Sequence, residues 1–390
     1  MDKGGFLMHH GVYVWDYSPF PHDPEEAHVT VLLTDLPQEI QLTFPVESGI
    51  RAVRLDGDAR EKGWVLSGTE QLIKAVSENW PPPLRDWRTA LHNAFRRARN
   101  RRPHKPLQAG KWQLPWHRRT LVMGILNVTP DSFSDGGKYE TIDAAVAHAR
   151  ALVAAGADII DVGGESTRPA GDVYGAGADY VSAAEEKERV LPIIARLSHE
   201  LDVPLSIDTY KAEVAEAAIL NGACIVNDVW GLKRDPHMAD VVARHDVPVV
   251  VMHNRERAAY RRPVVREIID DLWESVVRAR RAGIRDERII LDPGIGFGKT
   301  HPHNLEVMHR LERITYMGYP LLLGTSRKSL IGRTLNLPVG ERLFGTAATV
   351  AWGIAKGCAI VRVHDVKEMV HVSRMTDALH FHVEEEPVHG

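Results

Sequence analysis

The strongest constraint on the fold is an alternation of short apolar runs and helical segments that begins after residue 115. The apolar runs are rich in Val, Ile and Leu; there are eight, at residues 121–126, 159–162, 205–207, 225–226, 249–252, 289–291, 321–323 and 360–363. Helical patterns between them cover residues 142–155, 183–201, 211–220, 264–283 and 343–357. Continuous apolar strands separated by helices indicate a parallel sheet covered by helices. Eight such units over about 265 residues predict a closed (β/α)8 TIM barrel. An open doubly wound sheet is the alternative, but no Gly-x-Gly-x-x-Gly turn opens a first helix.

Residues 1–115 have a different character. Short strand-like pieces cover residues 28–33, 40–44 and 50–55, and a helical pattern covers residues 84–99. The stretch RRARNRRPHK (96–105) carries six positive charges and is broken at Pro103 and Pro106. We interpret it as a helix end that runs into a linker, because no aromatic residues lie between the charges as in a nucleic-acid patch. The sequence therefore predicts a small α+β N-terminal region over residues 1–115 and an α/β barrel domain over residues 116–390.

The composition excludes several other classes of protein. Hydrophobic residues make up 44% and charged residues 26% of the chain, which is typical of a folded globular protein. No run approaches the ~20 apolar residues of a membrane-spanning helix, and the first residues lack the apolar stretch of a secretory signal. The two cysteines, Cys224 and Cys358, offer neither a disulfide framework nor a Cys-x-x-Cys zinc site. With a formal net charge of −4, we expect a cytoplasmic protein that binds neither membranes nor nucleic acid.

Polar or charged residues follow each apolar run at its C-terminal end. They are Asn127, Asp161 with Glu165, Asp208, Asn227 with Asp228, His253 with Asn254, Asp292, Ser326 with Lys328, and Arg362 with His364. The carboxyl ends of barrel strands meet at one mouth, where barrel enzymes place their chemistry. A helix cap is the alternative for each residue singly, for example for Asp208 and Asn227. The repetition after every run favours a functional site.

The cations at this mouth indicate the chemistry of the ligand. Arg168, Lys328 and Arg362, with His364, accompany Gly-rich turns at residues 163–164, 294–298 and 324. Guanidinium and ammonium groups beside exposed backbone amides suit a phosphate or a diphosphate. The carboxylates of Asp208 and Asp292 suit hydrogen-bond donors on a heterocycle. The residues alone predict a barrel enzyme whose ligand has an anionic phosphate end and a planar end that donates hydrogen bonds.

A series of motifs carries a resemblance to a known family. The motifs are GILNVTPDSFSDGG (124–137), GADIIDVGGESTRP (156–169), PLSIDTYK (204–211), IVNDVWG (225–231), ILDPGIGFGKT (290–300), GTSRKSLIG (324–332) and VRVHDV (361–366). In this order they resemble the dihydropteroate synthases, over residues 121–379. The resemblance implies a transferase of folate biosynthesis that condenses 6-hydroxymethyl-7,8-dihydropterin diphosphate with 4-aminobenzoate to give 7,8-dihydropteroate and diphosphate. It also implies magnesium as cofactor, a homodimer, and sulfonamides as inhibitors.

The resemblance implies roles for individual residues. The pterin would be bound by Asp208, Asn227, Met252, Asp292 and Lys328. The diphosphate would be bound by Asn127, Arg362 and His364, and Asn127 would also hold magnesium. The 4-aminobenzoate side would be formed by Thr167, Arg168, Pro169, Phe297 and Ser329. The catalytic residues would be Phe133, Asp135 and Lys328. We expect an SN1-like route in which diphosphate departs first and Asp135 faces the cation left behind.

Some features depart from the family pattern. The segment AGDVYGAGADY (170–180) makes the loop after Pro169 longer than usual. Within residues 1–115, the pieces IRAVRLDGD (50–58), GWVLSGTEQLIKAV (63–76) and LRDWRTAL (84–91) are similar to an extension on some longer synthases, and the sequence assigns this region no chemistry. His301 and His303, like His9 and His10, have no carboxylate at ligand spacing, so we interpret them as surface histidines.

Two other functions compete with the synthase. A methyltransferase that binds methyltetrahydrofolate would need the pterin-binding residues but no diphosphate site. Lys328 and Arg362 with His364 therefore favour the synthase. A catalytically silent pterin-binding protein would have lost some of the site residues, and the sequence retains them.

Overall fold

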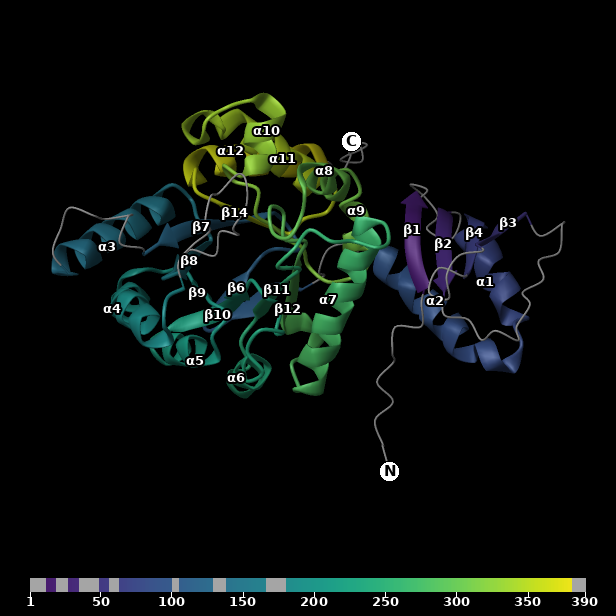
Figure 1. The fold of residues 1–390 in the computed structure, drawn as a ribbon, viewed down its shortest axis with the longest axis horizontal. Coiled ribbons are helices and arrows are strands. Elements are labelled where there is room, and N and C mark those ends of the chain that lie inside the picture. The colour runs from purple at the N-terminus through teal and green to yellow at the C-terminus, as the bar shows by residue number, and fades with distance from the viewer. Residues whose placement is uncertain are drawn as a thin grey trace, which may run out of the picture. The chain divides into compact units, whose positions relative to one another are not determined.

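The structure of the protein, a computed structural model, describes residues 12–18, 27–34, 49–55, 63–99, 105–128, 138–165 and 180–380. The chain divides into two compact units (Figure 1). The first comprises Met1–Arg101 with Glu312–Gly318, and the second comprises Arg102–Leu311 with Tyr319–Gly390.

The second unit is built around a parallel sheet. Its strands are β7 (Leu121–Asn127), β8 (Ile159–Gly163), β9 (Leu205–Asp208), β10 (Ala223–Asp228), β11 (Val249–Met252), β12 (Ile289–Asp292), β13 (Leu322–Leu323) and β14 (Ile360–Val363). They are ordered β12-β11-β10-β9-β8-β7-β14-β13. A parallel bridge between Leu291 of β12 and Leu321, just before β13, joins the two ends of the sheet. This closure confirms the predicted barrel.

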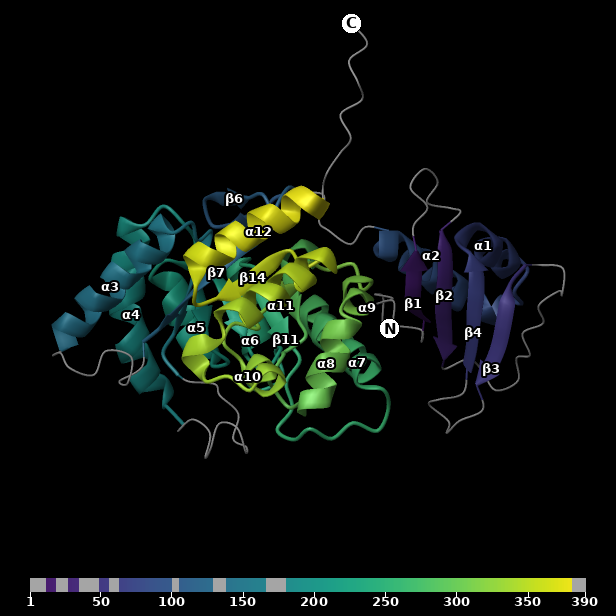
Figure 2. The same ribbon diagram turned by 90° about the horizontal axis from the view of Figure 1, so that it is seen from above.

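Helices cover the outside of the barrel (Figures 1 and 2). They are α3 (Lys138–Ala154), α4 (Ala183–Glu200), α5 (Ala212–Leu220), α6 (Met238–His245), α7 (Val264–Arg281), α8 (His301–His309), α10 (Ser329–Leu335), α11 (Leu343–Ala355) and α12 (Val366–His380). α7 is typical: Ile268, Leu272 and Val276 recur every four residues and are buried. The five helices predicted between the strands are present as α3, α4, α5, α7 and α11.

A short hairpin closes the end of the barrel opposite the mouth. Its strands are β5 (Leu107–Ala109) and β6 (Trp112–Leu114). Leu107 and Trp116 pack against residues near the N-terminal ends of the barrel strands, including Leu121 and Ile159. Because this hairpin shares the barrel core, the second unit begins at residue 102, whereas the sequence placed the start of the barrel domain at residue 116.

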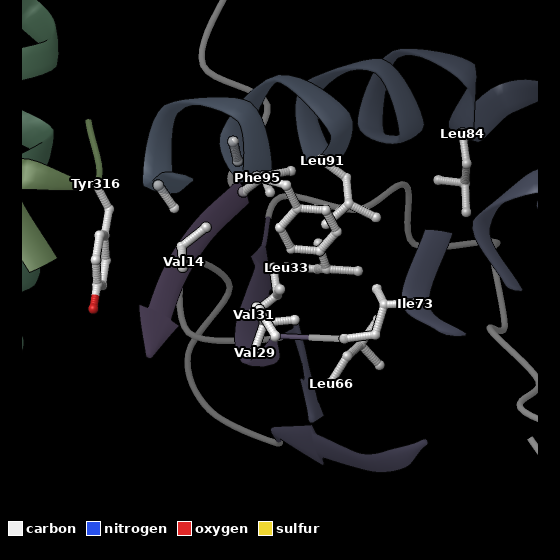
Figure 3. Packing of buried hydrophobic residues seen from close by; sticks show 14 residues of the cluster. Val14, Val29, Val31, Leu33, Leu66, Ile73, Leu84, Leu91, Phe95 and Tyr316 are labelled. Carbon is white, nitrogen blue, oxygen red and sulfur yellow. The ribbon is translucent and has the colours of Figure 1, made fainter. Parts of the chain in front are cut away.

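The first unit contains an antiparallel sheet of β1 (Val12–Ser18), β2 (His28–Thr34), β3 (Arg51–Leu55) and β4 (Gly63–Thr69), ordered β1-β2-β4-β3. Its helices are α1 (Glu70–Glu78) and α2 (Arg85–Arg99), and α9 (Glu312–Thr315) also belongs to this unit. Figure 3 shows Leu91 and Phe95 of α2 between this helix and the sheet, near Leu33. A Cβ atom on Gly63 would lie 2.1 Å from the carbonyl oxygen of Leu33, so only glycine fits there.

The α+β N-terminal region is thus present in the structure. The predicted strands at 28–33 and 50–55 correspond to β2 and β3, and the predicted helix at 84–99 corresponds to α2. The strand predicted at 40–44 lies outside the described residues. Within the described parts of both units, the helices are too short or too polar to cross a membrane.

Candidate active site

The register of the strands places the ends of β7 to β10 in one row at the barrel mouth. Asn127 lies opposite Gly163, Gly163 opposite Asp208, and Asp208 opposite Asn227. A Cβ atom on Gly163 would lie 3.5 Å from the Cβ of Asp208 and 3.8 Å from the Oδ1 of Asn127. Because Gly163 has no side chain, space remains between the amide of Asn127 and the carboxylate of Asp208.

The guanidinium of Arg362 lies at the centre of this mouth. From the end of β14, its Nε donates to Asp161 Oδ2 (2.6 Å) and its Nη2 donates to Asp208 Oδ2 (2.7 Å). Asn227 Nδ2 also donates to Asp161 Oδ2, at 3.0 Å. One cation therefore connects β14 with β8 and β9, and its two carboxylate partners raise the pKa of Arg362 despite its burial.

Two buried carboxylate oxygens at this centre lack a hydrogen-bond donor among the described residues. They are Asp161 Oδ1 and Asp208 Oδ1. Burial raises the pKa of Asp208 to about 7, against the opposing effect of Arg362, and the charge of Asp161 raises it further. A buried acceptor without a donor typically costs about 1–3 kcal/mol. Asp208 is therefore prepared for a ligand that donates hydrogen bonds.

Asp228 has a structural task rather than a ligand-binding one. Its Oδ1 accepts a hydrogen bond from the backbone N–H of Trp230 (2.8 Å), and its Oδ2 accepts one from that of Leu232 (2.7 Å). These bonds hold the turn after β10. Burial raises the pKa of Asp228 to about 6, and the backbone donors oppose this shift.

Lys328 and Asp292 form a second group at the mouth. Lys328 Nζ donates to the carbonyl of Ile295 (2.6 Å) and lies 4.7 Å from the centre of the Phe297 ring. Asp292 Oδ1 accepts from the N–H of Gly294 at 2.7 Å. Burial lowers the pKa of Lys328 to about 8, while Asp292 opposes this shift. Burial likewise raises the pKa of Asp292, which Lys328 opposes. Lys328 thus provides a cation and Asp292 an acceptor, and both have little access to water.

Glycines keep the chain close to this group. Gly294 has φ +65, and a Cβ atom there would lie 2.0 Å from the carbonyl oxygen of His253 and 3.2 Å from Cγ of Met252. Met252 itself ends β11 and is buried. Gly324 lies close to both cations: a Cβ atom there would lie 3.8 Å from Lys328 Nζ and 3.9 Å from Arg362 Cβ.

His364 faces the same mouth from the residue after β14. Its backbone N–H donates to Ser326 Oγ (3.1 Å), and its Nδ1 lies 3.0 Å from the same oxygen. Because Ser326 already accepts from the backbone N–H, its hydroxyl proton can be donated to Nδ1, which leaves Nε2–H as a free donor. Burial lowers the pKa of His364 to about 4, and Arg362 and Arg327 lower it further. An arriving anion would oppose this shift, because it favours the protonated ring.

A buried ion cluster that the sequence did not predict lies beside the mouth. Lys211 Nζ donates to Glu165 and to Glu186 Oε2, the latter at 2.5 Å. The rings of Tyr210 and Tyr180 have their centres 4.8 and 5.3 Å from the same ammonium. Glu165 and Lys211 belong to two of the motifs, so their positions were visible in the sequence, but their pairing across 46 residues was not.

The remaining predicted residues fall into two sets. Phe133, Asp135, Thr167, Arg168 and Pro169 lie outside the described residues. Ser329 begins α10 directly after Lys328 and is buried. His303 belongs to a capping box at the start of α8, in which it and Thr300 bond each other's backbone N–H groups. His303 is thus a partly exposed helix-capping residue, in agreement with its interpretation as a surface histidine.

The donors at the mouth fit magnesium only as an ion shared with a ligand. Magnesium prefers oxygen ligands and keeps several of its waters. Across the described ranges, no three His, Cys, Asp or Glu side chains gather so as to hold a metal ion. Asn127 offers one exposed amide oxygen in the row that also holds Asp208. One protein oxygen suits an ion whose other ligands are waters and phosphate oxygens.

Known proteins match this chain over the barrel. The model of the family described as pterin binding enzyme matches residues 123–364. The dihydropteroate synthase of Bacillus subtilis (strain 168) is 55% identical over 266 residues, which are 68% of this chain and 90% of the relative. The chain belongs to the dihydropteroate synthase family.

Solved dihydropteroate synthases have the same fold. The enzyme from Clostridium difficile, crystallised in the presence of pteroic acid, aligns with a TM-score of 0.65 and 50% identity, over 68% of this chain and 99% of that one. The Xanthomonas albilineans enzyme with 4-aminobenzoic acid aligns with a TM-score of 0.64 and 42% identity, over 68% and 94% of the two chains. The predicted family and barrel are thereby confirmed, and as a dihydropteroate synthase the protein is a transferase.

Proposed function

We propose that this synthase condenses 6-hydroxymethyl-7,8-dihydropterin diphosphate with 4-aminobenzoate and releases 7,8-dihydropteroate and diphosphate, a step of folate biosynthesis. The observation that carries the proposal is the ion pair of Arg362 with Asp208, whose Oδ1 accepts no hydrogen bond from the described residues. It puts a fixed cation and a free acceptor side by side at one mouth. A ligand with a diphosphate and a hydrogen-bond-donating heterocycle satisfies both. A solved relative from Xanthomonas albilineans holds 7,8-dihydropteroate.

The pterin end would lie among the buried acceptors and donors. Asp208 and Asp292 would accept from the ring amino and N–H groups, while Asn227 and Lys328 would donate to ring acceptors. Met252, which is buried beside Gly294, would contact the face of the ring. Asp208 would then gain the donor that its Oδ1 lacks.

The diphosphate end would lie against Arg362 and His364. The guanidinium supplies a fixed positive charge, and the neutral imidazole of His364 supplies a donor at Nε2. Asn127 would hold magnesium together with phosphate oxygens, and the ion, when bound, would offset the charge of the leaving diphosphate. These groups stabilise negative charge that grows as the C–O bond to diphosphate breaks, so they favour departure before attack.

The aminobenzoate nitrogen would then attack the electron-poor methylene carbon and lose its proton to solvent. Thr167, Arg168, Pro169, Phe297 and Ser329 are the residues we assign to the 4-aminobenzoate side. Phe133 and Asp135 would close over the pterin cation, with the carboxylate of Asp135 facing its charge. Sulfonamides, as aminobenzoate analogues, would compete at this side.

Product formation tests the proposed reaction. The purified chain is expected to form dihydropteroate from the two substrates only when magnesium is present. Lys328→Ala should lower kcat/KM for the pterin substrate by about 100-fold, because it removes a buried charged donor worth roughly 3 kcal/mol. The measurement is chromatographic detection of dihydropteroate with and without a chelator.

Lys187→Ala is the matched control for that substitution. Lys187 forms an exposed ion pair with Glu213 on the barrel surface, at 2.9 Å, so its loss should leave turnover unchanged. Pterin binding without any product would refute the proposed reaction and favour a silent pterin-binding protein.

We further propose that the synthase is a cytoplasmic homodimer that associates through α11 and α12, which lie side by side (Figure 2). Large apolar side chains are exposed on these helices: Phe344 (84%), Trp352 (44%), Met375 (59%) and Leu379 (70%). Such a group of exposed apolar side chains is typical of an interaction surface. Both cysteines are buried and free, which suits a reducing compartment.

Phe344→Ser is expected to weaken this dimer by about 30-fold, because a central aromatic residue of an interface contributes roughly 2 kcal/mol. Sedimentation equilibrium over a range of protein concentrations measures the change. Leu220→Ser is the control, since Leu220 is 74% exposed on α5, away from this surface. An unchanged dimer in Phe344→Ser, or a monomeric native chain, would contradict the proposed interface.

A further inference from the structure

Lys299 ends the loop after β12 and makes three hydrogen bonds with its ammonium group. Nζ donates to the carbonyls of Gly294 (2.8 Å) and Phe297 (3.0 Å), and it lies 2.8 Å from Nδ1 of His253. Burial lowers the pKa of Lys299, and Asp292 opposes this shift. The two carbonyls and the imidazole together occupy the three hydrogen-bonding positions of Nζ. No donor is left over for a substrate.

The imidazole that receives one of these bonds is itself held in place. His253 is fully buried, and its Nε2 lies 3.1 Å from Oδ2 of Asp271 on α7. The ring makes its hydrogen bond through Nδ1, which faces Lys299, whereas Nε2 makes none with the described residues although it lies close to Asp271. Burial and the charge of Lys299 lower the pKa of His253 to about 3, which keeps the ring neutral. Arg255 holds the same Asp271 oxygen through Nε (2.9 Å) and Nη2 (2.7 Å).

The loop held by Lys299 also contacts the proposed pterin site. The carbonyl of Ile295 accepts from Lys328, the ring of Phe297 lies against the same ammonium, and the N–H of Gly294 donates to Asp292. Lys299 thus bonds the carbonyls of Gly294 and Phe297, while Lys328 bonds the carbonyl of Ile295 between them. Both lysines act on one short loop.

This loop needs an external anchor because of its composition. Gly294, Gly296 and Gly298 all have positive φ, at +65, +88 and +54. Glycine is the residue that adopts these angles without strain, but it also loses the most conformational freedom when it is fixed. The ammonium of Lys299 fixes two carbonyls of the loop at once, so it offsets that loss.

We propose that Lys299 is a positioning residue of the pterin site, which holds the 294–298 loop so that Ile295 and Phe297 fix the ammonium of Lys328. The inference rests on the proposed function only in taking Lys328 as a pterin ligand. Lys299 does not touch the substrate and acts through Lys328. Its removal should therefore weaken pterin binding, and should do so only while Lys328 is present.

A double-mutant cycle on pteroic acid binding tests this coupling. Lys299→Met should raise the dissociation constant by about 30-fold, measured by calorimetry at a temperature where thermal unfolding shows the variant to be folded. The double variant Lys299→Met with Lys328→Ala should bind no more weakly than Lys328→Ala alone. Additive losses would overturn the inference, because Lys299 would then act independently of Lys328.

Tyr260→Phe is the matched control, because Tyr260 bonds the same loop from the segment that precedes α7. It removes the hydroxyl that donates to the carbonyl of Gly298 at 2.8 Å but leaves every bond of Lys299 in place. Tyr260→Phe should raise the dissociation constant for pteroic acid by less than threefold. An increase as large as that for Lys299→Met would overturn the inference, because any loosening of the loop would then weaken binding. If the Lys299→Met variant does not fold, Lys299→Gln replaces it, because glutamine retains two N–H donors. Lys299→Gln should lower the affinity for pteroic acid by less than Lys299→Met is expected to, and an unchanged affinity would overturn the inference. If the native chain binds no pteroic acid, the proposed function itself is contradicted.

Discussion

Replacing Arg362 with methionine is expected to remove most of the activity and to destabilise the barrel. The guanidinium compensates the burial of two carboxylates, Asp161 and Asp208, at 2.6 and 2.7 Å. Breaking a buried ion pair from one side typically costs about 3–5 kcal/mol, because the remaining charge is left uncompensated. The same group is our proposed diphosphate ligand, so kcat/KM should fall by roughly 1000-fold. Steady-state kinetics and urea unfolding of the same preparation measure the two effects.

A second substitution separates stability from binding in this variant. Asp161→Asn in the Arg362→Met background removes one uncompensated charge, so it should restore part of the free energy of unfolding but none of the activity. Arg278→Met is the surface control, because its ion pair with Glu274 at 2.8 Å is exposed and is worth less than about 1 kcal/mol. Restored turnover in the double variant would show that Arg362 has no role with diphosphate.

The sequence was sufficient for the barrel because its strands are continuous apolar runs. Strands that are buried on both faces are apolar at every position, so they can be recognised without an alternation of polar and apolar residues. Each of the predicted runs overlaps one of β7 to β14. The strands β5 and β6, by contrast, have only three residues each, which is too short to give a pattern. β1 and β4 were missed for another reason: VYVWDYS and GWVLSGT mix polar and apolar residues without a clean alternation.

The site was predictable one residue at a time, but its pairings were not. Asp208, Asn227, Asp292 and Arg362 stand at strand ends, so the barrel fold alone brings them to one mouth. Which groups bond is set by side chains that reach across the mouth, as when Arg362 bonds Asp161 201 residues away. Asp228 also follows an apolar run, but both of its carboxylate oxygens accept hydrogen bonds from backbone N–H groups of the next turn, so it does not belong to the ligand-binding group.

Lys211→Met is expected to lower the free energy of unfolding by about 3–5 kcal/mol, because it leaves two buried carboxylates without their cation. The side chains of Lys211, Glu165 and Glu186 are 8%, 9% and 1% exposed, so water cannot replace the ammonium. Burial already raises the pKa of Glu186, and Lys211 opposes that shift. Without the lysine this pKa rises further, and the protonated, neutral carboxyl is tolerated where the charged one is not.

The sign of the pH dependence follows from that pKa. Below it Glu186 takes up a proton in the folded variant and loses its charge, so the destabilisation should be smaller at pH 5 than at pH 8 and should grow as the pH rises through the folded pKa. Urea unfolding of native and variant protein at both pH values measures this difference. Lys187→Met, which breaks only the exposed pair with Glu213, should cost less than about 1 kcal/mol at either pH. An equal loss at pH 5 and pH 8 for Lys211→Met would mean that the destabilisation does not come from the uncompensated charge of Glu186.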